Sequence, residues 1–278
     1  MGYTKIESGS RKSEQLSELR DFLDAEAARI NSPAFIADDP VQFPRRFDDQ
    51  RDAEIAALLC STIAWGNRRM ICSNCDKLLA LMGHDPYRYV MDRGFEDLPD
   101  GNIHRTFFAA NMRNYLRGLY GIYSRYGTLE SYAVAVGAPQ HEAPAWIIAQ
   151  AINSAIAEAC DGKGDSRCMP MNLDSSALKR LNMALRWLVR DDGIVDMGLW
   201  KALTPAQLFI PLDVHVGNVS RELGLLTRKA NDRKSVMELT EVLRSFRPDD
   251  PVIYDYALFG IGIESKNNRT KPMELEGL

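Results

Sequence analysis

The sequence lacks a long apolar run. None of its hydrophobic segments reaches the roughly 18 residues that a membrane span needs. The apolar fraction, 45% of 278 residues, is that of an ordinary globular protein. Residues 1–20 are polar and charged and contain no signal-peptide core. These absences predict a cytoplasmic protein that has no membrane partner.

Cysteine is scarce and odd in number, which excludes a regular disulfide framework. The cysteines are Cys60, Cys72, Cys75, Cys160 and Cys168. Cys72 and Cys75 have the spacing of a zinc-binding pair, but no second pair at ligand spacing follows them. The pattern favours free thiols, and we expect neither a metal nor another cofactor.

The chain also lacks an excess of positive charge. It carries 34 Lys and Arg against 38 Asp and Glu, for a net charge of −4. Many nucleic-acid-binding proteins are strongly basic. The balance therefore argues mildly against that class, although a local basic face is enough for an enzyme that binds DNA.

Alternating strand patterns are absent, whereas apolar residues recur at helical spacing along most of the chain. The helices predicted in this way cover residues 13–30, 50–65, 67–82, 103–126, 143–160, 175–190, 214–223, 234–246 and 251–261. Asp250 before Pro251 is a typical helix start. The Gly- and charge-rich segment 161–173 predicts a loop, and 265–278 a frayed tail. The sequence predicts one all-α unit, 1–278, with about ten helices.

Lys179 is a candidate nucleophile. Asp174 or Ser175 would cap the helix that follows, which places Lys179 near the first turn. The helix dipole and desolvation both favour a neutral amine there, and a neutral lysine can form a Schiff base. The alternative is a solvated lysine on an exposed helix face.

Asp213 is the second candidate. It follows Pro211-Leu212 and opens a helix that ends at Gly224. An aspartate there caps the helix, a contribution of about 1 kcal/mol. The same rigid carboxylate could stabilise positive charge that develops on a sugar in a transition state. Both interpretations fit the sequence.

These two segments resemble motifs of the helix-hairpin-helix glycosylase superfamily, the relatives of endonuclease III. Leu173, Lys179 and Asn182 are in register with the pattern L-P-G-V-G-[RK]-K-T-A-N, and 211–225 resembles V-D-T-H-V-x-R-V-x-x-R-L-G-L. The segment 249–260 is similar to the closing helix of that superfamily. Most of the chain also resembles a bacterial family of unknown function (DUF2400-like), through features such as 186–190 and 211–216.

The resemblance implies a two-lobed all-α fold with a cleft between the lobes, acting as a monomer on double-stranded DNA that carries a damaged base. Lys179 would attack C1′ of the damaged nucleotide. Asp213 would assist its deprotonation and stabilise the charged sugar. A lysine at this position implies base removal followed by β-elimination.

The chain departs from the superfamily pattern in several places. Ser175 and Ala177 replace the hairpin glycines, although Ser175 and Ser176 could still donate to a phosphate. Lys179 and Asp213 are 34 residues apart, so 191–210 must loop out. Archaeal 8-oxoguanine glycosylases resemble the chain in carrying a long insert here, which suggests an oxidised purine. The four-cysteine iron–sulfur loop is missing, so we expect no cluster.

Other residues are candidates for DNA contact, each with a structural alternative. Trp65 and Asn67 lie in a turn that also holds two arginines, and could stack on a base and read its edge, or simply pack. Trp200 could line a base pocket or pack the insert against the body, and His215 could touch phosphate or be structural. Arg180 belongs to a set that would form a phosphate-binding footprint if its members face one way. Its other members are Arg186, Arg190, Arg221, Arg228 and Lys229.

An alternative function is a helix-hairpin-helix protein that binds nucleic acid or another partner without catalysis. The altered hairpin and the acidic net charge favour it. The retained Lys179 and Asp213 favour the enzyme, because a binding module has no need of that pair.

Overall fold

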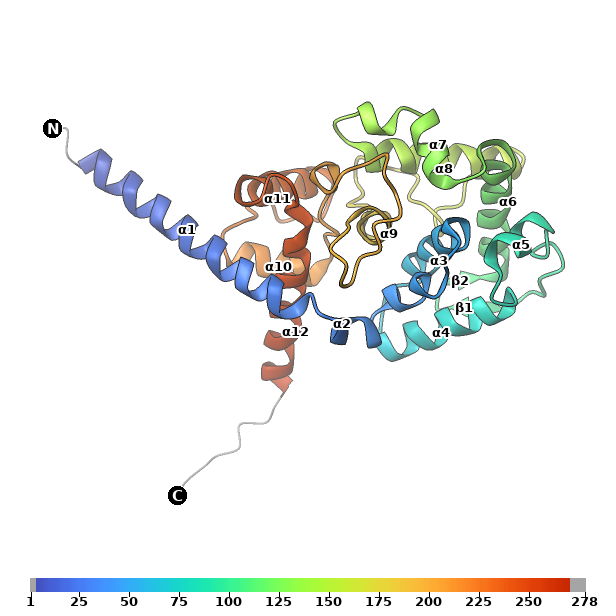
Figure 1. The fold of residues 1–278 in the computed structure, drawn as a ribbon, viewed down its shortest axis with the longest axis horizontal. Coiled ribbons are helices and arrows are strands. Elements are labelled where there is room, and N and C mark those ends of the chain that lie inside the picture. The colour runs from blue at the N-terminus through green and yellow to red at the C-terminus, as the bar shows by residue number, and fades with distance from the viewer. Residues whose placement is uncertain (1–3, 271–278) are drawn as a thin grey trace, which may run out of the picture.

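The structure is a computed structural model that describes the backbone of residues 4–270 and the side chains of residues 14–264. The prediction of an all-α fold is confirmed (Figure 1). The described residues form the α-helices α1 (Thr4–Ile30), α2 (Pro33–Ala37), α3 (Gln50–Thr62), α4 (Arg68–Leu81), α5 (Pro86–Met91), α6 (Ala109–Tyr126), α7 (Leu129–Ala135), α8 (Pro144–Ala159), α9 (Lys179–Val189), α10 (Val214–Glu222), α11 (Arg233–Phe246) and α12 (Tyr254–Thr270).

A short β-hairpin corrects the prediction of a helix from residue 103. Strands β1 (Asn102–His104) and β2 (Phe107–Phe108) pair antiparallel, and α6 begins only at Ala109. Arg105, between the strands, has a φ of 52°, in the left-handed region that a helix cannot contain. The hairpin therefore precedes α6 where the apolar spacing suggested continuous helix.

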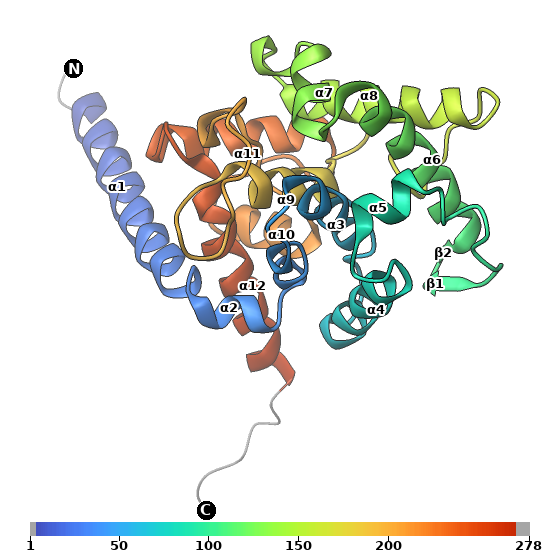
Figure 2. The ribbon, with the colours of Figure 1, turned by 45° about the vertical axis from the view of Figure 1, so that its right-hand side comes forward.

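The helices form two groups on either side of a central helix (Figures 1 and 2). In one group α6 packs on α8, and α5 packs on both α3 and α6. In the other, α12 packs on α1 and α10. Helix α1 lies along α12 at its C-terminal end and extends beyond the body at its N-terminal end (Figure 1). One continuous cluster of buried apolar side chains runs through both groups.

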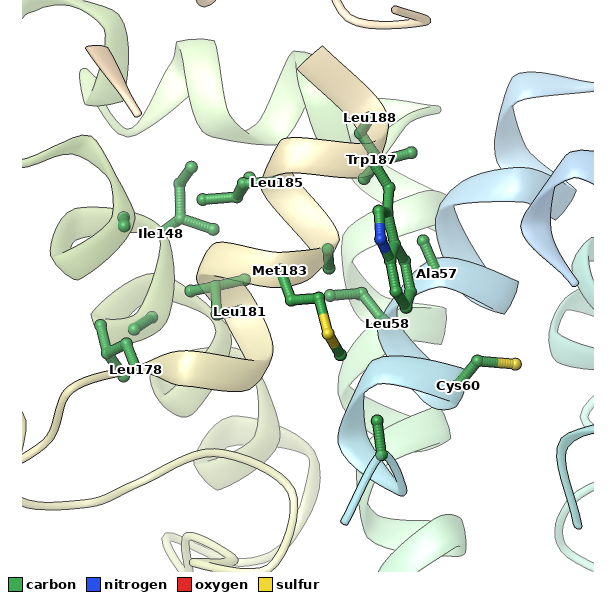
Figure 3. Close-up of a cluster of buried hydrophobic side chains, with 14 of the residues drawn as sticks. Ala57, Leu58, Cys60, Ile148, Leu178, Leu181, Met183, Leu185, Trp187 and Leu188 are labelled. Atoms are coloured by element: carbon green, nitrogen blue, oxygen red, sulfur yellow. The ribbon is translucent and has the colours of Figure 1, made fainter. Parts of the chain in front are cut away.

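Helix α9 is the central helix and carries the first candidate residue. It packs against α3 on one side and α8 on the other. Figure 3 shows Leu181 and Leu185 near Ile148 of α8, and Trp187 beside Leu58 of α3. Every residue from 181 to 190 is buried. The start of α9 is therefore held in a fixed position, which is a requirement for a catalytic side chain.

The segment 191–210 is packed onto the body by buried polar contacts. Asp196 is 2% exposed, forms ion pairs with Arg186 (3.2 Å) and Arg190 (3.0 Å) and accepts a hydrogen bond from the Tyr256 hydroxyl at 2.9 Å. These contacts connect the segment to α9 and α12. Asp250 occupies the predicted N-cap position before Pro251, but its side chain makes no capping hydrogen bond and instead accepts a hydrogen bond from Arg190 Nε at 2.8 Å.

Two other expectations concern the ends and the cysteines of the chain. Helix α12 continues to Thr270 through part of the predicted tail, and 271–278 lie outside the described residues. All five cysteines are free thiols. Among the described residues, no helix has the length and apolar character needed to cross a membrane.

Gly118 lies where α6 and α8 approach most closely. An added Cβ there would come 2.7 Å from Ile156 Cγ1 and 3.1 Å from the Ile156 backbone nitrogen, whereas one at Gly121 would meet nothing within 4 Å. We expect Gly118→Ala to lower the free energy of unfolding by about 1–3 kcal/mol through overpacking. Gly121→Ala should raise it by about 0.5–1 kcal/mol through helix propensity. Urea denaturation measures both, and effects of the same sign would contradict this packing.

Candidate active site

A cleft of about 890 Å³ lies between the two groups of helices. Its walls come from the α3–α4 connection, the segment before α9, the start of α10 and the middle of α12. Ligand pockets in proteins are typically about 300–1,000 Å³. Lys179 and Asp213 both line this cleft, so the structure brings together the two residues that the sequence selected as catalytic.

The helix that carries Lys179 starts later than the sequence suggested. Lys179 is its first residue, and Leu178, with φ 47° and ψ 33°, occupies the N-cap position. Asp174 cannot cap from four residues further away and instead forms an exposed ion pair with Arg233 at 3.0 Å. Ser176 Oγ accepts a hydrogen bond from the Leu178 backbone nitrogen at 3.1 Å and fixes the turn.

The Lys179 side chain is partly buried and lines the cleft. Its Nζ donates a hydrogen bond to the Ala64 carbonyl oxygen, at 3.4 Å. Burial lowers the pKa of Lys179, against the opposing charges of Asp213, Asp255 and Asp39. Desolvation therefore outweighs the carboxylates, and the neutral amine is populated at lower pH than in an ordinary lysine.

Asp213 is held at both its side chain and its backbone. Its Oδ1 accepts a hydrogen bond from the Val216 backbone nitrogen at 2.9 Å, so the carboxylate caps α10. Asn231 Nδ2 donates to the Asp213 carbonyl oxygen at 3.0 Å. Oδ2 makes no hydrogen bond within the described part of the chain and is available to the cleft. The capping role and a role in the cleft are thus compatible in one side chain.

Asp255 on α12 is a site residue that the sequence analysis missed. It lines the cleft, is 7% exposed and forms an ion pair with Arg186. Burial raises its pKa to about 6, and Asp213 adds to this, whereas Arg186 and Lys179 oppose it. A single acidic residue in the apolar stretch 251–261 was the available signal for this position.

Trp65 and Arg180 form a stacked pair in the cleft wall. The Arg180 guanidinium carbon lies 4.3 Å from the centre of the Trp65 ring, and both residues line the cleft. Buried His104 holds the turn, because its Nε2 donates to the Trp65 carbonyl oxygen at 2.9 Å. Asn74 Nδ2 donates to the other ring nitrogen at 2.9 Å, which assigns the proton to Nε2.

Asn67, His215 and Ser176 also line the cleft. Asn67 caps α4, where its Oδ1 accepts from the Met70 backbone nitrogen at 3.2 Å. Its amide nitrogen remains available as a donor. His215 is exposed in the first turn of α10. These three residues could contact a ligand at the mouth of the cleft.

Three residues selected from the sequence do not line the cleft. Ser175 is exposed outside it. Asn182 is 1% exposed, and its Nδ2 donates to the Ala177 carbonyl oxygen at 3.1 Å, so it stabilises the turn before α9. Trp200 is also 1% exposed and donates from Nε1 to Glu54 Oε1 at 2.8 Å. Trp200 packs the insert and is not part of a base pocket.

The predicted basic footprint is also only partly formed. Arg186 and Arg190 are buried in ion pairs and cannot reach a phosphate. Arg221 donates to the Arg228 carbonyl oxygen at 2.7 Å and to Asn231 Oδ1 at 2.6 Å. Of this set, Arg180 is the member that lines the cleft without a carboxylate partner among the described residues.

The donor set of the cleft suits an amine-based or acid–base reaction. Within the described residues, no three His, Cys, Asp or Glu side chains gather as metal ligands. The cleft is instead lined by one primary amine, that of Lys179, together with three carboxylates and three guanidiniums. These belong to Asp39, Asp213 and Asp255, and to Arg68, Arg180 and Arg186. A lysine whose pKa is lowered by burial is a nucleophile toward an electrophilic carbon.

Comparison with known proteins shows the family of the chain. Neither the curated proteins nor the solved structures gave a match. The family model described as "Protein of unknown function (DUF2400)" matches residues 39–264, which is most of the chain and includes Lys179, Asp213, Asp255 and Arg180. The chain belongs to this family.

Proposed function

We propose that the protein is a DNA glycosylase with associated β-lyase activity that acts in base-excision repair. The observation that carries this proposal is that the Lys179 amine, with a pKa lowered by burial, and the Asp213 carboxylate line one cleft. The motif resemblance at 173–182 and 211–225 supports the same assignment. The size of the cleft also suits a nucleotide rotated out of a duplex.

The proposed reaction begins with the neutral amine of Lys179. Its nitrogen bonds to C1′ of the nucleotide, the C1′–N bond breaks, and the base leaves with the bonding electrons and takes up a proton. Asp213 accepts the proton that the lysine nitrogen loses. O4′ then leaves C1′ with the electrons of the C1′–O4′ bond and takes the proton from Asp213, while the lone pair of the lysine nitrogen forms the C=N bond of the Schiff base. Loss of a proton from C2′ expels the 3′ phosphate and cuts the strand.

Asp213 serves this reaction through its position. One carboxylate oxygen is fixed by the helix that it caps, and the other is available to the cleft. Its negative charge favours a transition state in which positive charge builds on the sugar. Asp255 also lines the cleft, and its ion pair with Arg186 connects α12 to α9.

The test of this proposal is base release and strand cleavage on duplexes that carry 8-oxoguanine, uracil, an oxidised pyrimidine or an abasic site. We expect cleavage by the wild type on at least one of them, loss of cleavage in Lys179→Gln, and no change in Lys201→Gln. Lys201 is a matched control because it is exposed and outside the cleft. Binding without release or cleavage of any substrate would favour a non-catalytic nucleic-acid-binding protein.

A further inference from the structure

Three arginines on or next to the lining of the cleft form no ion pair within the described residues: Arg180 lines the cleft, Arg105 lies against the lining residue Gly66, and Arg167 lies between the lining residues Ser166 and Cys168. Most arginines of the described chain contact a carboxylate, and several of these pairs are buried. Arg105, Arg167 and Arg180 do not, and among the described residues neither do Arg45, Arg69, Arg221 and Arg247; the first three are distinguished by lying together beside the cleft. A guanidinium without an acidic partner is open to an anion from outside the chain.

A series of contacts joins these three residues. Arg167 Nη1 donates to Thr106 Oγ1 at 3.2 Å, in the turn between β1 and β2, and Thr106 directly follows Arg105. The Arg105 guanidinium lies against Gly66, where an added Cβ would come 2.5 Å from its Nη1. Gly66 follows Trp65, on whose ring Arg180 stacks. We call Arg105, Arg167 and Arg180 the arginine rim.

Arg105 adopts an unfavourable backbone conformation in order to occupy this place. Its φ of 52° lies in the left-handed region, which costs a residue other than glycine about 1–2 kcal/mol. Asn102 Nδ2 holds the turn by donating to the Arg105 carbonyl oxygen at 2.5 Å. A glycine would adopt the same turn without strain. A strained arginine with no carboxylate partner suggests a side chain that is there for binding.

A second polar group at the rim lacks a partner. The Tyr115 side chain is 0% exposed and lines the cleft, and its buried hydroxyl makes no hydrogen bond in the described chain. Thr62 is a polar side chain beside this hydroxyl, and it opposes the rise in the Tyr115 pKa that burial causes. Burial lowers the pKa of Arg180, and the positive charge of Arg167 lowers it further. The Tyr115 phenol has the opposite effect and raises it. A buried hydroxyl and a desolvated guanidinium thus lie near one another beside the cleft.

The carboxylate nearest to the rim in the chain is already occupied. Asp165, two residues before Arg167, accepts hydrogen bonds from Asn111 Nδ2 at 2.9 Å, from Asn114 Nδ2 at 3.0 Å and from the Arg167 backbone nitrogen at 2.9 Å. It therefore fixes the backbone of the loop at 161–173 and leaves the Arg167 guanidinium free to point elsewhere.

We propose that the arginine rim binds the phosphodiester backbone of the DNA strand that enters the cleft. The β1–β2 hairpin and the loop at 161–173 would then form a DNA-contacting surface on the opposite side of the cleft from α10. Several neighbouring guanidiniums suit the successive phosphates of a polyanion, which bind arginine through charge-assisted hydrogen bonds. The inference rests on the proposed function, because the rim borders the cleft that holds Lys179.

The test measures binding of the full chain to a duplex that contains a tetrahydrofuran abasic analogue, which has no base to release. Fluorescence anisotropy over a series of salt concentrations gives the affinity and its salt slope. We expect Arg105→Gly and Arg167→Gln each to weaken binding severalfold. Each should also reduce the slope of log K against log salt by about 0.9, the value for one phosphate contact.

Arg93→Gly is the matched control. Arg93 also has a positive φ, 56°, but it forms an ion pair with Glu96 at 3.0 Å, whereas Arg105 has no such partner and lies against Gly66 of the cleft lining. We expect unchanged affinity and salt slope in this variant. Both glycine variants should keep or raise the Tm, because each relieves strain. A loss of Tm in Arg105→Gly would indicate a structural role and overturn the proposal.

Two results separate this inference from the proposed function. If the rim variants lose affinity while no base is released from any duplex, the rim is supported and the glycosylase proposal fails. If the wild type releases a base and the rim variants bind with unchanged affinity and salt slope, the proposal that the arginine rim binds DNA is wrong. The proposal of a glycosylase is then supported. A wild type that does not bind the duplex overturns the rim as well.

Discussion

Replacement of Lys179 by methionine is expected to abolish strand cleavage and to make the protein more stable. Without the amine no Schiff base forms, so we expect cleavage to fall by at least about 10³-fold. Methionine matches the shape of the lysine stem and carries no charge. Because burial lowers the pKa of Lys179, the folded protein binds this proton less tightly than the unfolded chain does, and the ammonium form destabilises the fold.

The pH dependence of this gain has a definite sign. The ammonium form of Lys179 lowers the free energy of unfolding. This loss of stability has its full size at pH values below the pKa that Lys179 has in the folded protein. It disappears as the pH rises toward 10.5, the value of an ordinary lysine. The Tm gain of Lys179→Met should therefore be larger at pH 7 than at pH 10. Thermal unfolding at the two pH values measures it, and a lower Tm for the variant at pH 7 would contradict a desolvated amine.

The control is Lys201→Met. Lys201 is exposed, and its Nζ donates to the Gly198 carbonyl oxygen at 2.7 Å and lies 3.3 Å from Asp191 Oδ2. Exposed ion pairs contribute about 0–1 kcal/mol. We expect this variant to retain cleavage and to show little change in Tm at either pH, so that the two effects are specific to the lysine in the cleft.

Asp196→Ala is expected to cause the largest loss of stability. The Asp196 carboxylate is buried, pairs with Arg186 and Arg190 and accepts a hydrogen bond from the Tyr256 hydroxyl. Removing one partner from a buried ion pair costs about 3–5 kcal/mol when the remaining charge is left uncompensated. Arg186 keeps Asp255 and Arg190 keeps Asp250, so we expect a loss toward the lower end of this range. Here two guanidiniums lose a carboxylate, and the segment 191–210 loses its connection to α9 and α12.

Asp191→Ala is the matched control in the same segment, because Asp191 is exposed and pairs only with Lys201 in the described chain. Its removal should change the free energy of unfolding by less than about 1 kcal/mol. Guanidinium denaturation of both variants gives the comparison. Similar losses for the two variants would show that the buried cluster does not hold the insert.

The long helices could be predicted because each buries an apolar face that recurs at helical spacing. Helices α3, α8 and α11 lie within a few residues of the predicted ranges. The short helices α2, α5 and α7 were not predicted, because five to seven residues contain too few turns to show a period. The β1–β2 hairpin was missed because it is so short that no alternation develops.

The start of α9 illustrates the limit of local signals. Asp174 and Ser175 are good capping residues, yet the helix starts at Lys179 after a left-handed Leu178. The chain accepts this strain because Leu178 is buried in the core, 3% exposed, and tertiary packing outweighs the local capping preference. Capping signals alone could not reveal this.

The candidate site could be predicted only where a motif covered it. Four residues were chosen because of the sequence segments in which they lie, and all four line the cleft: Lys179, Asp213, Trp65 and Arg180. Asp255 was not selected, although it is the single acidic residue of the apolar stretch 251–261, because its place in the site depends on α12 lying beside α9. Trp200 was selected for its place in the insert, but its contact with Glu54, far away in the sequence, places it in the core.

Borohydride trapping tests the central claim most directly, because it captures the bond between the lysine and the sugar. The wild type is incubated with the same four duplexes and reduced, and the position of the adduct is mapped by mass spectrometry. We expect a covalent adduct on Lys179 with at least one duplex, absent from Lys179→Gln and present in Lys201→Gln. No adduct with any duplex from folded protein, or an adduct on another lysine, would contradict the account.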